Sequence, residues 1–349
     1  TVEVLAGIED MLRTQLDRGP GFVLADYFDF VAGTSTGAII AACISLGMKA
    51  DEIRSFYAGS GREMFDKASL LKRFHYKYED DKLIHEMQNV FGENTTLGSD
   101  RLRTVLMMVM RNATTDSPWP LSNNPFAKYN QPDRRNAPHF DCNLDFPLWK
   151  LVRASTAAPV YFPPEIFEMG NKRFIFVDGG VTTYNNPAFL AFMMATVEPY
   201  RINWSTGERD LLVVSIGTGT SPRADENLDP SGMNLLYNAG SIPSALMYAA
   251  LNEQDFLCRA FGNCLSGDVL DREISDMIGA KGPTASKLFT YMRYNAELSR
   301  QGLNRLNLSD IEPEQVRQLD SVEHIPALQR IGRAIVERKV KSEHFTRFV

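Results

Sequence analysis

A serine with a glycine two places away on either side could act as a nucleophile. Ser35 lies between Gly33 and Gly37, in the pattern Gly-x-Ser-x-Gly. Apolar residues precede this motif and small apolar residues follow it, which predicts a buried strand, a sharp turn and a helix. Such a turn projects a hydroxyl, and the start of the helix places backbone N–H groups and the positive end of a dipole beside it. The same residues are also typical of an ordinary turn, so the assignment depends on a partner.

A serine hydroxyl needs a neighbouring base to act as a nucleophile at neutral pH. Asp178 is the best-placed carboxylate, because it ends the apolar stretch 173–177 and is followed by Gly179 and Gly180. Sites in open α/β sheets form beyond the carboxyl ends of strands, and we expect Ser35 and Asp178 there on neighbouring parallel strands. The alternative interpretation of Asp178 is a turn former in an Asp-Gly pair.

A Ser–His–Asp triad on an α/β-hydrolase fold is the competing arrangement. In that fold several strands precede the nucleophile, whereas only 34 residues precede Ser35. The histidines that follow Asp178 are His324 and His344, and no strand is predicted before either of them. We therefore predict a Ser–Asp dyad and interpret both histidines as surface residues.

Composition and charge are typical of a globular cytoplasmic protein with a large core. Of 349 residues, 44% are hydrophobic and 23% are charged, and the formal net charge is −6. Nucleic-acid-binding proteins usually carry a basic excess, so we expect no DNA partner. No apolar run approaches the roughly 18–20 residues of a membrane span, and the start of the chain shows no signal-peptide pattern.

The cysteines indicate neither a disulfide framework nor a metal site. Four are present, with no C-x-x-C pair and no zinc spacing to the five histidines: Cys43, Cys142, Cys258 and Cys264. This pattern favours a reducing compartment. Cys43 lies in the apolar stretch after Ser35 and is interpreted as a small core residue.

Helical and strand patterns alternate along the chain. Helical periodicity covers 2–17, 38–47, 52–65, 148–156, 188–197, 243–260 and 325–340. Buried strands are predicted before Ser35 and over 102–110, 173–177, 210–216 and 288–294. This order predicts an α/β fold, a three-layer sandwich with a mostly parallel central sheet.

Two further features concern the organisation of the chain. We expect a single domain over 1–349, with roughly 221–349 as a C-terminal helical extension packed on it. The segment 111–130 is rich in Asn, Thr, Ser and Pro, and is expected to be a functional loop or a packed surface excursion.

Four spaced motifs resemble the successive signatures of the patatin-like phospholipase family. They are 33–37 (GTSTG), 157–162 (AAPVYF), 178–180 (DGG) and 215–219 (SIGTG). Their order across residues 1 to about 220 is more specific than one Gly-x-Ser-x-Gly. The resemblance implies Ser35 as nucleophile, Asp178 as base, and hydrolysis of acyl esters of membrane glycerophospholipids through an acyl-enzyme, without metal or cofactor.

One part of the family pattern is absent. The family has a glycine-rich loop before its first helix, and the backbone N–H groups of that loop form the oxyanion hole. Residues 1–5 resemble the helix that follows the loop. We expect the loop upstream of Thr1; the alternative is a non-catalytic form, since losing one oxyanion donor costs about 10²–10³ in rate.

The segment 110–120 and the overall size resemble bacterial patatin-like effectors of anti-phage defence. These are activated by a cyclic nucleotide and degrade the membrane of their own cell. The resemblance implies a cyclic di- or trinucleotide activator and peripheral contact with the inner membrane. It also offers a phosphate ligand for the basic residues at 72–77 and 330–341, for which a solvated face is the alternative.

Three matters stay open in the sequence. A nucleotide-sensing or interaction protein on the same scaffold, without hydrolysis, is one alternative function. An acyltransferase that uses Ser35 with an acceptor other than water is another. A homo-oligomer is compatible with the sequence, which does not define the oligomeric state.

Overall fold

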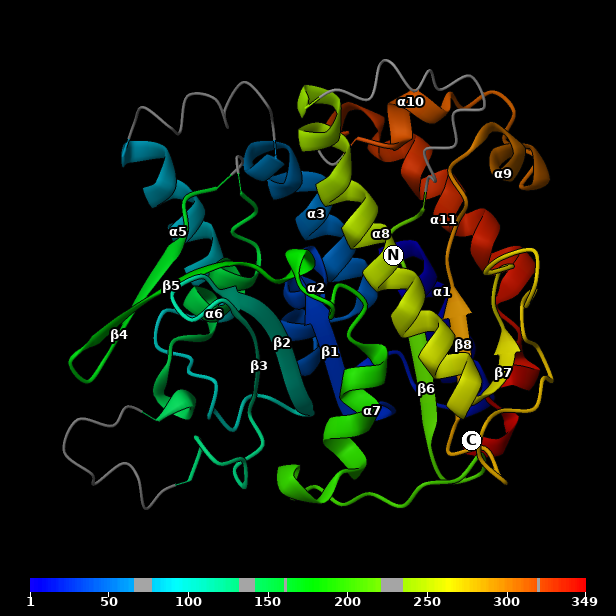
Figure 1. Ribbon diagram of the computed structural model, residues 1–349, viewed down its shortest axis with the longest axis horizontal. Coiled ribbons are helices and arrows are strands. Elements are labelled where there is room, and N and C mark those ends of the chain that lie inside the picture. Colours follow the sequence, from blue (N-terminus) through cyan, green and yellow to red (C-terminus); the bar gives the residue numbers. More distant parts are fainter. Residues whose placement is uncertain (66–76, 132–141, 160–161, 221–234, 319–320) are drawn as a thin grey trace.

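The computed structural model describes residues 1–65, 77–131, 142–159, 162–220, 235–318 and 321–349. In this part of the chain, two sheets lie side by side between layers of helices (Figure 1). The strands are β1 (Phe30–Thr34), β2 (Val105–Asn112), β3 (Ser117–Ser122), β4 (Glu165–Met169), β5 (Lys172–Asp178), β6 (Leu212–Ile216), β7 (Asn263–Ser266) and β8 (Thr290–Tyr294). The order is β1-β2-β5-β4 in one sheet, with β3 also paired to β2, and β6-β8-β7 in the other.

The helices agree in position with most of the periodic stretches of the sequence. They are α1 (Val2–Gln15), α2 (Thr36–Ser45), α3 (Ala50–Phe65), α5 (Lys77–Phe91), α6 (Leu148–Ser155), α7 (Ala188–Thr196), α8 (Leu235–Phe261), α9 (Arg300–Arg305), α10 (Pro313–Val316) and α11 (Ile325–Lys339). Short 3-10 helices are η1 (Leu24–Asp26), η3 (Asn143–Asp145), η4 (Gly179–Val181), η5 (Glu198–Tyr200), η7 (Val322–His324), η8 (Ser342–His344) and η9 (Thr346–Phe348). None of the helices in the described ranges is both long and apolar enough to span a bilayer.

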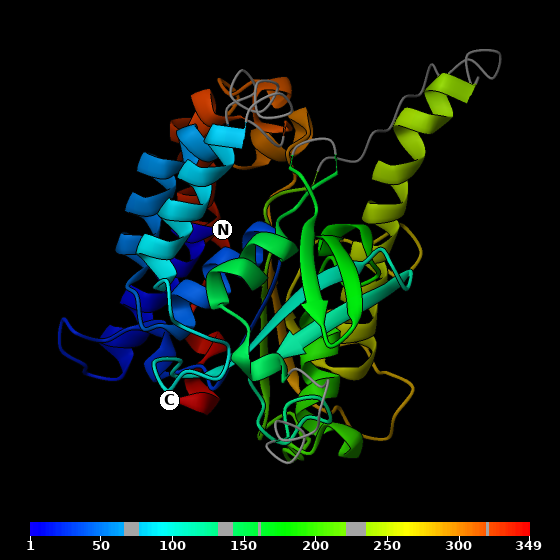
Figure 2. The same ribbon diagram turned by 90° about the vertical axis from the view of Figure 1, so that its left-hand side faces the viewer.

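The layers form the predicted α/β sandwich. Figure 2 shows the sheets from the side, with α1, α3, α5 and α11 on one face and α7 and α8 on the other. The middle of β2, from Leu106 to Met110, is fully buried between these layers. α2 packs on β1 and β2, and its apolar residues from Ala38 to Ile44 are buried. Burial on all sides explains why this helix has small and apolar residues around its whole circumference.

The parallel arrangement is confirmed for the central strands. β1 pairs with β2 in parallel, and β6 and β7 each pair in parallel with β8. The antiparallel pairs all involve β3, β4 or β5. The strand that ends at Asp178 is β5, so the expectation that Ser35 and Asp178 follow neighbouring parallel strands is wrong.

β1 and β5 instead meet end to end along one edge of β2. β3 pairs with β2 over 107–112, whereas β1 pairs over 105–109 and β5 over 110–112. Because a strand has only two edges, β1 and β5 must share the edge opposite β3. β1 runs parallel to β2 and β5 antiparallel to it, so their carboxyl ends converge where Thr34 pairs with Val109 and Asp178 pairs with Met110.

The segment 111–130 is not a loop throughout, because it contains β3. Pro118 and Pro120 argue against a strand in the sequence, since proline cannot donate to a sheet ladder. β3 pairs only with β2 and is therefore an edge strand, where proline is tolerated. The segment thus extends the sheet beside β2.

Residues 221–349 do not form a purely helical extension. β7 and β8 lie in this region, and β8 is the central strand of its sheet, paired to β6 from the earlier part of the chain. β8 is buried along its whole length. The second sheet contains β6 from the earlier part of the chain and β7 and β8 from the C-terminal region. The C-terminal region is therefore part of the sandwich and not an extension packed on it.

β1 and β6 lie next to each other without pairing. Neither has a second strand partner in the described part of the chain, and a cavity of about 160 Å³ separates them. Phe30 and Ala32 line it from β1, and residues 212–216 line it from β6. The two sheets are therefore separated by a gap between two strand edges, which α7 covers from one face.

Candidate active site

Ser35 occupies a strained turn between β1 and α2. Its φ of 57° and ψ of −129° lie in a region that non-glycine residues rarely adopt. This is the predicted strand–turn–helix arrangement, which projects a serine side chain from the end of a sheet. α2 begins at the next residue, so its N-terminal end lies beside the hydroxyl.

Of the two glycines that flank Ser35, only Gly33 is needed for space. A Cβ at Gly33 would lie 2.0 Å from the carbonyl oxygen of Gly37 and 2.6 Å from the nitrogen of Ala38. A Cβ at Gly37 would meet nothing within 4 Å. The turn is therefore closed by the approach of α2 to the backbone of Gly33, and the pattern Gly-x-Ser-x-Gly overstates the role of Gly37 in the bend.

A buried serine that the sequence analysis missed holds this turn in place. Ser155, at the end of α6, is fully buried. Its hydroxyl accepts a hydrogen bond from the N–H of Ser35 at 3.0 Å and donates one to the carbonyl oxygen of Val109 at 2.6 Å. The sequence does contain a signal for it: a hydroxyl on the apolar face of a helix that also buries Leu151 and Val152.

Asp178 lies within hydrogen-bond distance of the Ser35 hydroxyl. The Oγ of Ser35 donates to Oδ2 of Asp178 at 2.5 Å, and the N–H of Gly180 donates to Oδ1 at 2.6 Å. The N–H of Asp178 donates to the carbonyl oxygen of Ala157, at the start of the 157–162 motif. The predicted pair of residues is therefore brought together, 143 positions apart in sequence, with both carboxylate oxygens hydrogen-bonded.

The environment of Asp178 makes its carboxylate more basic than that of an exposed aspartate. Its side chain is only 5% exposed. Burial raises the pKa of the Asp178 carboxyl above its ordinary value, and the hydrogen bonds from Ser35 and Gly180 partly offset this effect. A carboxylate with a raised pKa accepts a proton more readily than one in water.

The glycines after Asp178 also differ in their importance. A Cβ at Gly179 would lie 2.2 Å from the carbonyl oxygen of Val109. A Cβ at Gly180 would come no closer than 3.0 Å to another atom. A glycine is therefore required at position 179, where the chain leaving β5 lies against the backbone of β2. Gly180 contributes mainly the hydrogen bond from its N–H to Asp178.

The C-terminal histidines lie elsewhere. His344 is half-buried, and its Nδ1 is 2.8 Å from the hydroxyl of the buried Tyr294. His344 is thus a packed residue rather than a free surface histidine, and His324 begins α11 as its N-cap. Neither is among the hydrogen-bond partners of Ser35 or Asp178 in the described part of the chain.

The cysteines are free and buried, and burial raises the pKa of the Cys43 thiol to about 12. Cys43 is therefore a core residue, as predicted. Within the described ranges, His, Cys, Asp and Glu side chains form no group of three that could hold a metal ion.

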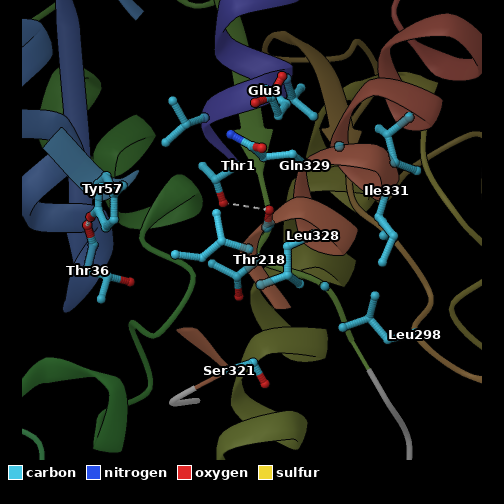
Figure 3. A pocket seen from close by; sticks show the side chains of 18 of the residues that line it. Thr1, Glu3, Thr36, Tyr57, Thr218, Leu298, Ser321, Leu328, Gln329 and Ile331 are labelled. Atoms are coloured by element: carbon cyan, nitrogen blue, oxygen red, sulfur yellow. Dashed lines mark hydrogen bonds between the residues drawn. The ribbon is translucent and has the colours of Figure 1, made fainter. Parts of the chain in front are cut away.

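A cavity of about 300 Å³ opens beside the start of α2 (Figure 3). Thr36, next to Ser35, lines one side of it, and Leu328 and Ile331 of α11 line the other. The hydroxyl of Thr1 donates to the carbonyl oxygen of Gly217 at 2.9 Å, which joins α1 to the 215–219 motif at the wall of this cavity. The 215–219 motif therefore shares this cavity with Thr36, the residue that follows Ser35.

Fold and site together define an α/β protein with a serine–aspartate pair at two converging strand ends. The chain belongs to the patatin-like phospholipase family, because the model of that family matches residues 4–192. This confirms the family that the four motifs resemble.

Curated relatives agree with the family assignment. Patatin group J-1 of Solanum tuberosum is 29% identical over 240 residues, which cover 64% of this chain and 58% of that protein. Patatin-17 of Solanum cardiophyllum is 28% identical with the same coverage. The chain therefore spans about 58% of the length of these relatives. Among solved structures, VipD from Legionella pneumophila aligns with a TM-score of 0.38 and 13% identity, over 96% of this chain and 65% of that one.

The two glycines beside Ser35 provide a matched test of the turn. We expect Gly33→Ala to lower the free energy of unfolding by about 3 kcal/mol or more, because its Cβ would overlap the backbone of α2. Gly37→Ala, in open space on a helix, should instead raise it by about 0.5–1 kcal/mol. Urea unfolding followed by circular dichroism measures both. Equal effects of the two substitutions would contradict this account of the turn.

Proposed function

We propose that this protein hydrolyses acyl esters of membrane glycerophospholipids, with Ser35 as nucleophile and Asp178 as general base. The observation that carries the proposal is the hydrogen bond of 2.5 Å from Ser35 Oγ to the buried carboxylate of Asp178. Membership of the patatin-like phospholipase family supports the choice of a lipid ester as substrate.

The proposed reaction has two halves. Ser35 Oγ attacks the ester carbonyl carbon while Asp178 Oδ2 accepts the hydroxyl proton, and the tetrahedral intermediate collapses to an acyl-serine. The proton on Asp178 then passes to the departing alcohol. In the second half, Asp178 accepts a proton from water, the hydroxide attacks the acyl-serine, and the fatty acid leaves as Ser35 recovers its proton.

The geometry supports a direct transfer between the two residues. Ser35 is held by its N–H bond to Ser155, and Asp178 is held by the N–H of Gly180, so neither side chain has to move to meet the other. Such fixed positions remove part of the entropic barrier to the reaction. The N-terminal end of α2 adds favourable electrostatics where negative charge develops.

We propose that the principal oxyanion donors come from the glycine-rich loop expected upstream of Thr1. Thr1 lies at the cavity beside Thr36 and is hydrogen-bonded to Gly217. A chain that enters α1 at this point passes close to the start of α2.

The dyad is tested by conservative substitution. Ser35→Ala should reduce ester hydrolysis by at least about 10⁴-fold, and Asp178→Asn by at least about 10³-fold, because each removes one partner of the proton transfer. Both variants should keep the far-ultraviolet circular dichroism of the parent. The measurement is fatty-acid release from phosphatidylcholine by the full-length protein. Retained activity in folded Ser35→Ala protein would refute the proposal.

The pH dependence tests the identity of the base. Only ionised Asp178 can accept the proton, so kcat/KM should fall as pH decreases through its pKa, by about tenfold per pH unit below it. Because burial raises this pKa, the acid limb should lie at a higher pH than for an exposed aspartate. A double variant, His324→Gln with His344→Gln, should leave the limb in place. A shift of the limb in that variant would point to a histidine base.

The proposed regulation by a cyclic di- or trinucleotide, and a role in anti-phage defence at the inner membrane, rest on the sequence resemblance. The residues Lys72, Arg73 and His75 lie outside the described part of the chain. On and after α11, Arg330 pairs with Asp310 and Lys339 with Asp268. These pairs favour the solvated-face interpretation of the 330–341 cluster.

Activation is tested by assaying phospholipid hydrolysis with a panel of cyclic di- and trinucleotides. We expect one of them to raise the rate at least tenfold, with its linear hydrolysis product as an inactive control. An unchanged rate with every nucleotide would remove the activator from the proposal while leaving hydrolysis in place. Added acceptor alcohols in the same assay would reveal an acyltransferase by ester products in place of free fatty acid.

A further inference from the structure

α8 differs sharply between its two halves. Its C-terminal half is packed into the molecule: Gln254, Asp255, Cys258 and Arg259 are buried. Its N-terminal half stands away from the rest of the chain in Figure 2. Every residue from 242 to 246 is exposed, with Ile242 at 50% and Leu246 at 65%.

The exposed half has a composition unusual for a helix in water. Residues 241–252 (SIPSALMYAALN) contain no charged side chain. Ile242 and Leu246 are four positions apart and thus lie on one face, and Tyr248, on another face, is also exposed. A solvent-exposed helix normally carries charges on its outer surface. Burying these exposed apolar side chains in the interfacial region of a bilayer would remove them from water, and the segment carries no charge that would oppose the transfer.

The base of α8 is rigidly held. Arg259 pairs with Asp255, and Tyr291 donates its hydroxyl to the same carboxylate at 2.9 Å. Arg259 also donates to the carbonyl oxygens of Asp268 and Asp276. Each of the three guanidinium nitrogens of Arg259 thus donates at least one hydrogen bond, which fixes the helix relative to the sheet. The exposed half therefore projects from a firm base.

The exposed half also lies beside the dyad. A Cβ built on Gly180 would be 3.6 Å from the terminal methyl of Met247, and Gly180 donates the hydrogen bond to Asp178. Ile242 and Leu246 precede Met247 on the same helix, and both side chains are exposed. A surface that accepted these two side chains would thus be brought to the side of the molecule that holds Asp178.

We propose that the N-terminal half of α8 inserts into the interfacial region of a phospholipid bilayer and positions the dyad at its substrate. The choice of a lipid surface rests on the proposed phospholipase function. Because residues 241–252 carry no charge, the contact depends on apolar insertion rather than on attraction to anionic headgroups. It therefore differs from a contact made by a basic cluster, which salt would weaken.

The test uses a double variant of the exposed half of α8, Ile242→Glu with Leu246→Glu, in the full-length protein. We call it the tip variant. Val269→Glu with Ile278→Glu is the matched control, because these residues are 64% and 48% exposed and lie in the loop after β7. Binding to phosphatidylcholine vesicles is measured by flotation, with Ser35→Ala in every protein so that hydrolysis cannot alter the vesicles. The tip variant should bind at least tenfold more weakly, and the control should bind within twofold of the parent.

Two further measurements separate a membrane contact from other roles. Adding phosphatidylglycerol or 0.5 M NaCl should change vesicle binding by less than twofold. With Ser35 intact, the ratio of vesicle-lipid hydrolysis to hydrolysis of a short soluble ester should fall at least tenfold in the tip variant.

Several results would overturn the inference. These are vesicle binding by the tip variant equal to that of the parent, binding that requires anionic lipid, an equal loss of both hydrolytic activities, and a parent dimer that the tip variant converts to monomers with vesicle binding intact. A parent protein that hydrolyses no ester, yet binds vesicles through Ile242 and Leu246, would refute the proposed function and leave this inference standing.

Discussion

The hydrogen bond between Ser35 and Asp178 depends on two strand ends that face each other along one edge of β2. β1 and β5 approach from opposite directions and stop at Val109 and Met110. The carbonyl oxygen of Val109 lies at the centre of this junction. It accepts a hydrogen bond from the hydroxyl of Ser155, and that hydroxyl accepts a hydrogen bond from the N–H of Ser35. The same carbonyl oxygen leaves no room for a side chain at Gly179. One peptide group of β2 thus constrains the positions of both Ser35 and Asp178.

The proximity of Ser35 and Asp178 was predictable because each follows an apolar stretch and has a glycine within two positions after it. The direction of β5 relative to β2 could not be predicted. β5 reaches the site as one strand of an antiparallel hairpin with β4, and its partly exposed residues do not distinguish a parallel from an antiparallel strand. β3 was missed because Pro118 and Pro120 contradict a strand unless its edge position is known. β8 was found, yet its central place depends on pairing with β6, which is remote in sequence.

The residues that support the site were the hardest to predict. Gly33 and Gly37 are equivalent in the motif, and only the position of α2 shows that Gly33 alone lacks space for a Cβ. Ser155 is one of many serines, and its role depends on the depth at which α6 packs against β2. Arg330 and Lys339 of α11 pair with Asp310 and Asp268, which are remote from them in sequence, so the pattern of basic residues alone does not reveal these partners. In each case the role of the residue depends on a contact with a segment that is distant in the sequence or on the packing of a neighbouring helix, and the sequence pattern shows neither.

The same desolvation that raises the pKa of Asp178 links the site to the surface beside it. A buried carboxylate is a stronger base, but it is stable as an anion only while Ser35 and Gly180 donate to it. If Ile242 and Leu246 inserted into a bilayer, the lipid would lie close to Met247 and Gly180 and would exclude water from this side of the carboxylate. Hydrogen bonds in a drier site are stronger. Contact with the membrane would therefore favour proton transfer from Ser35 when the protein is bound to the surface that contains its substrate.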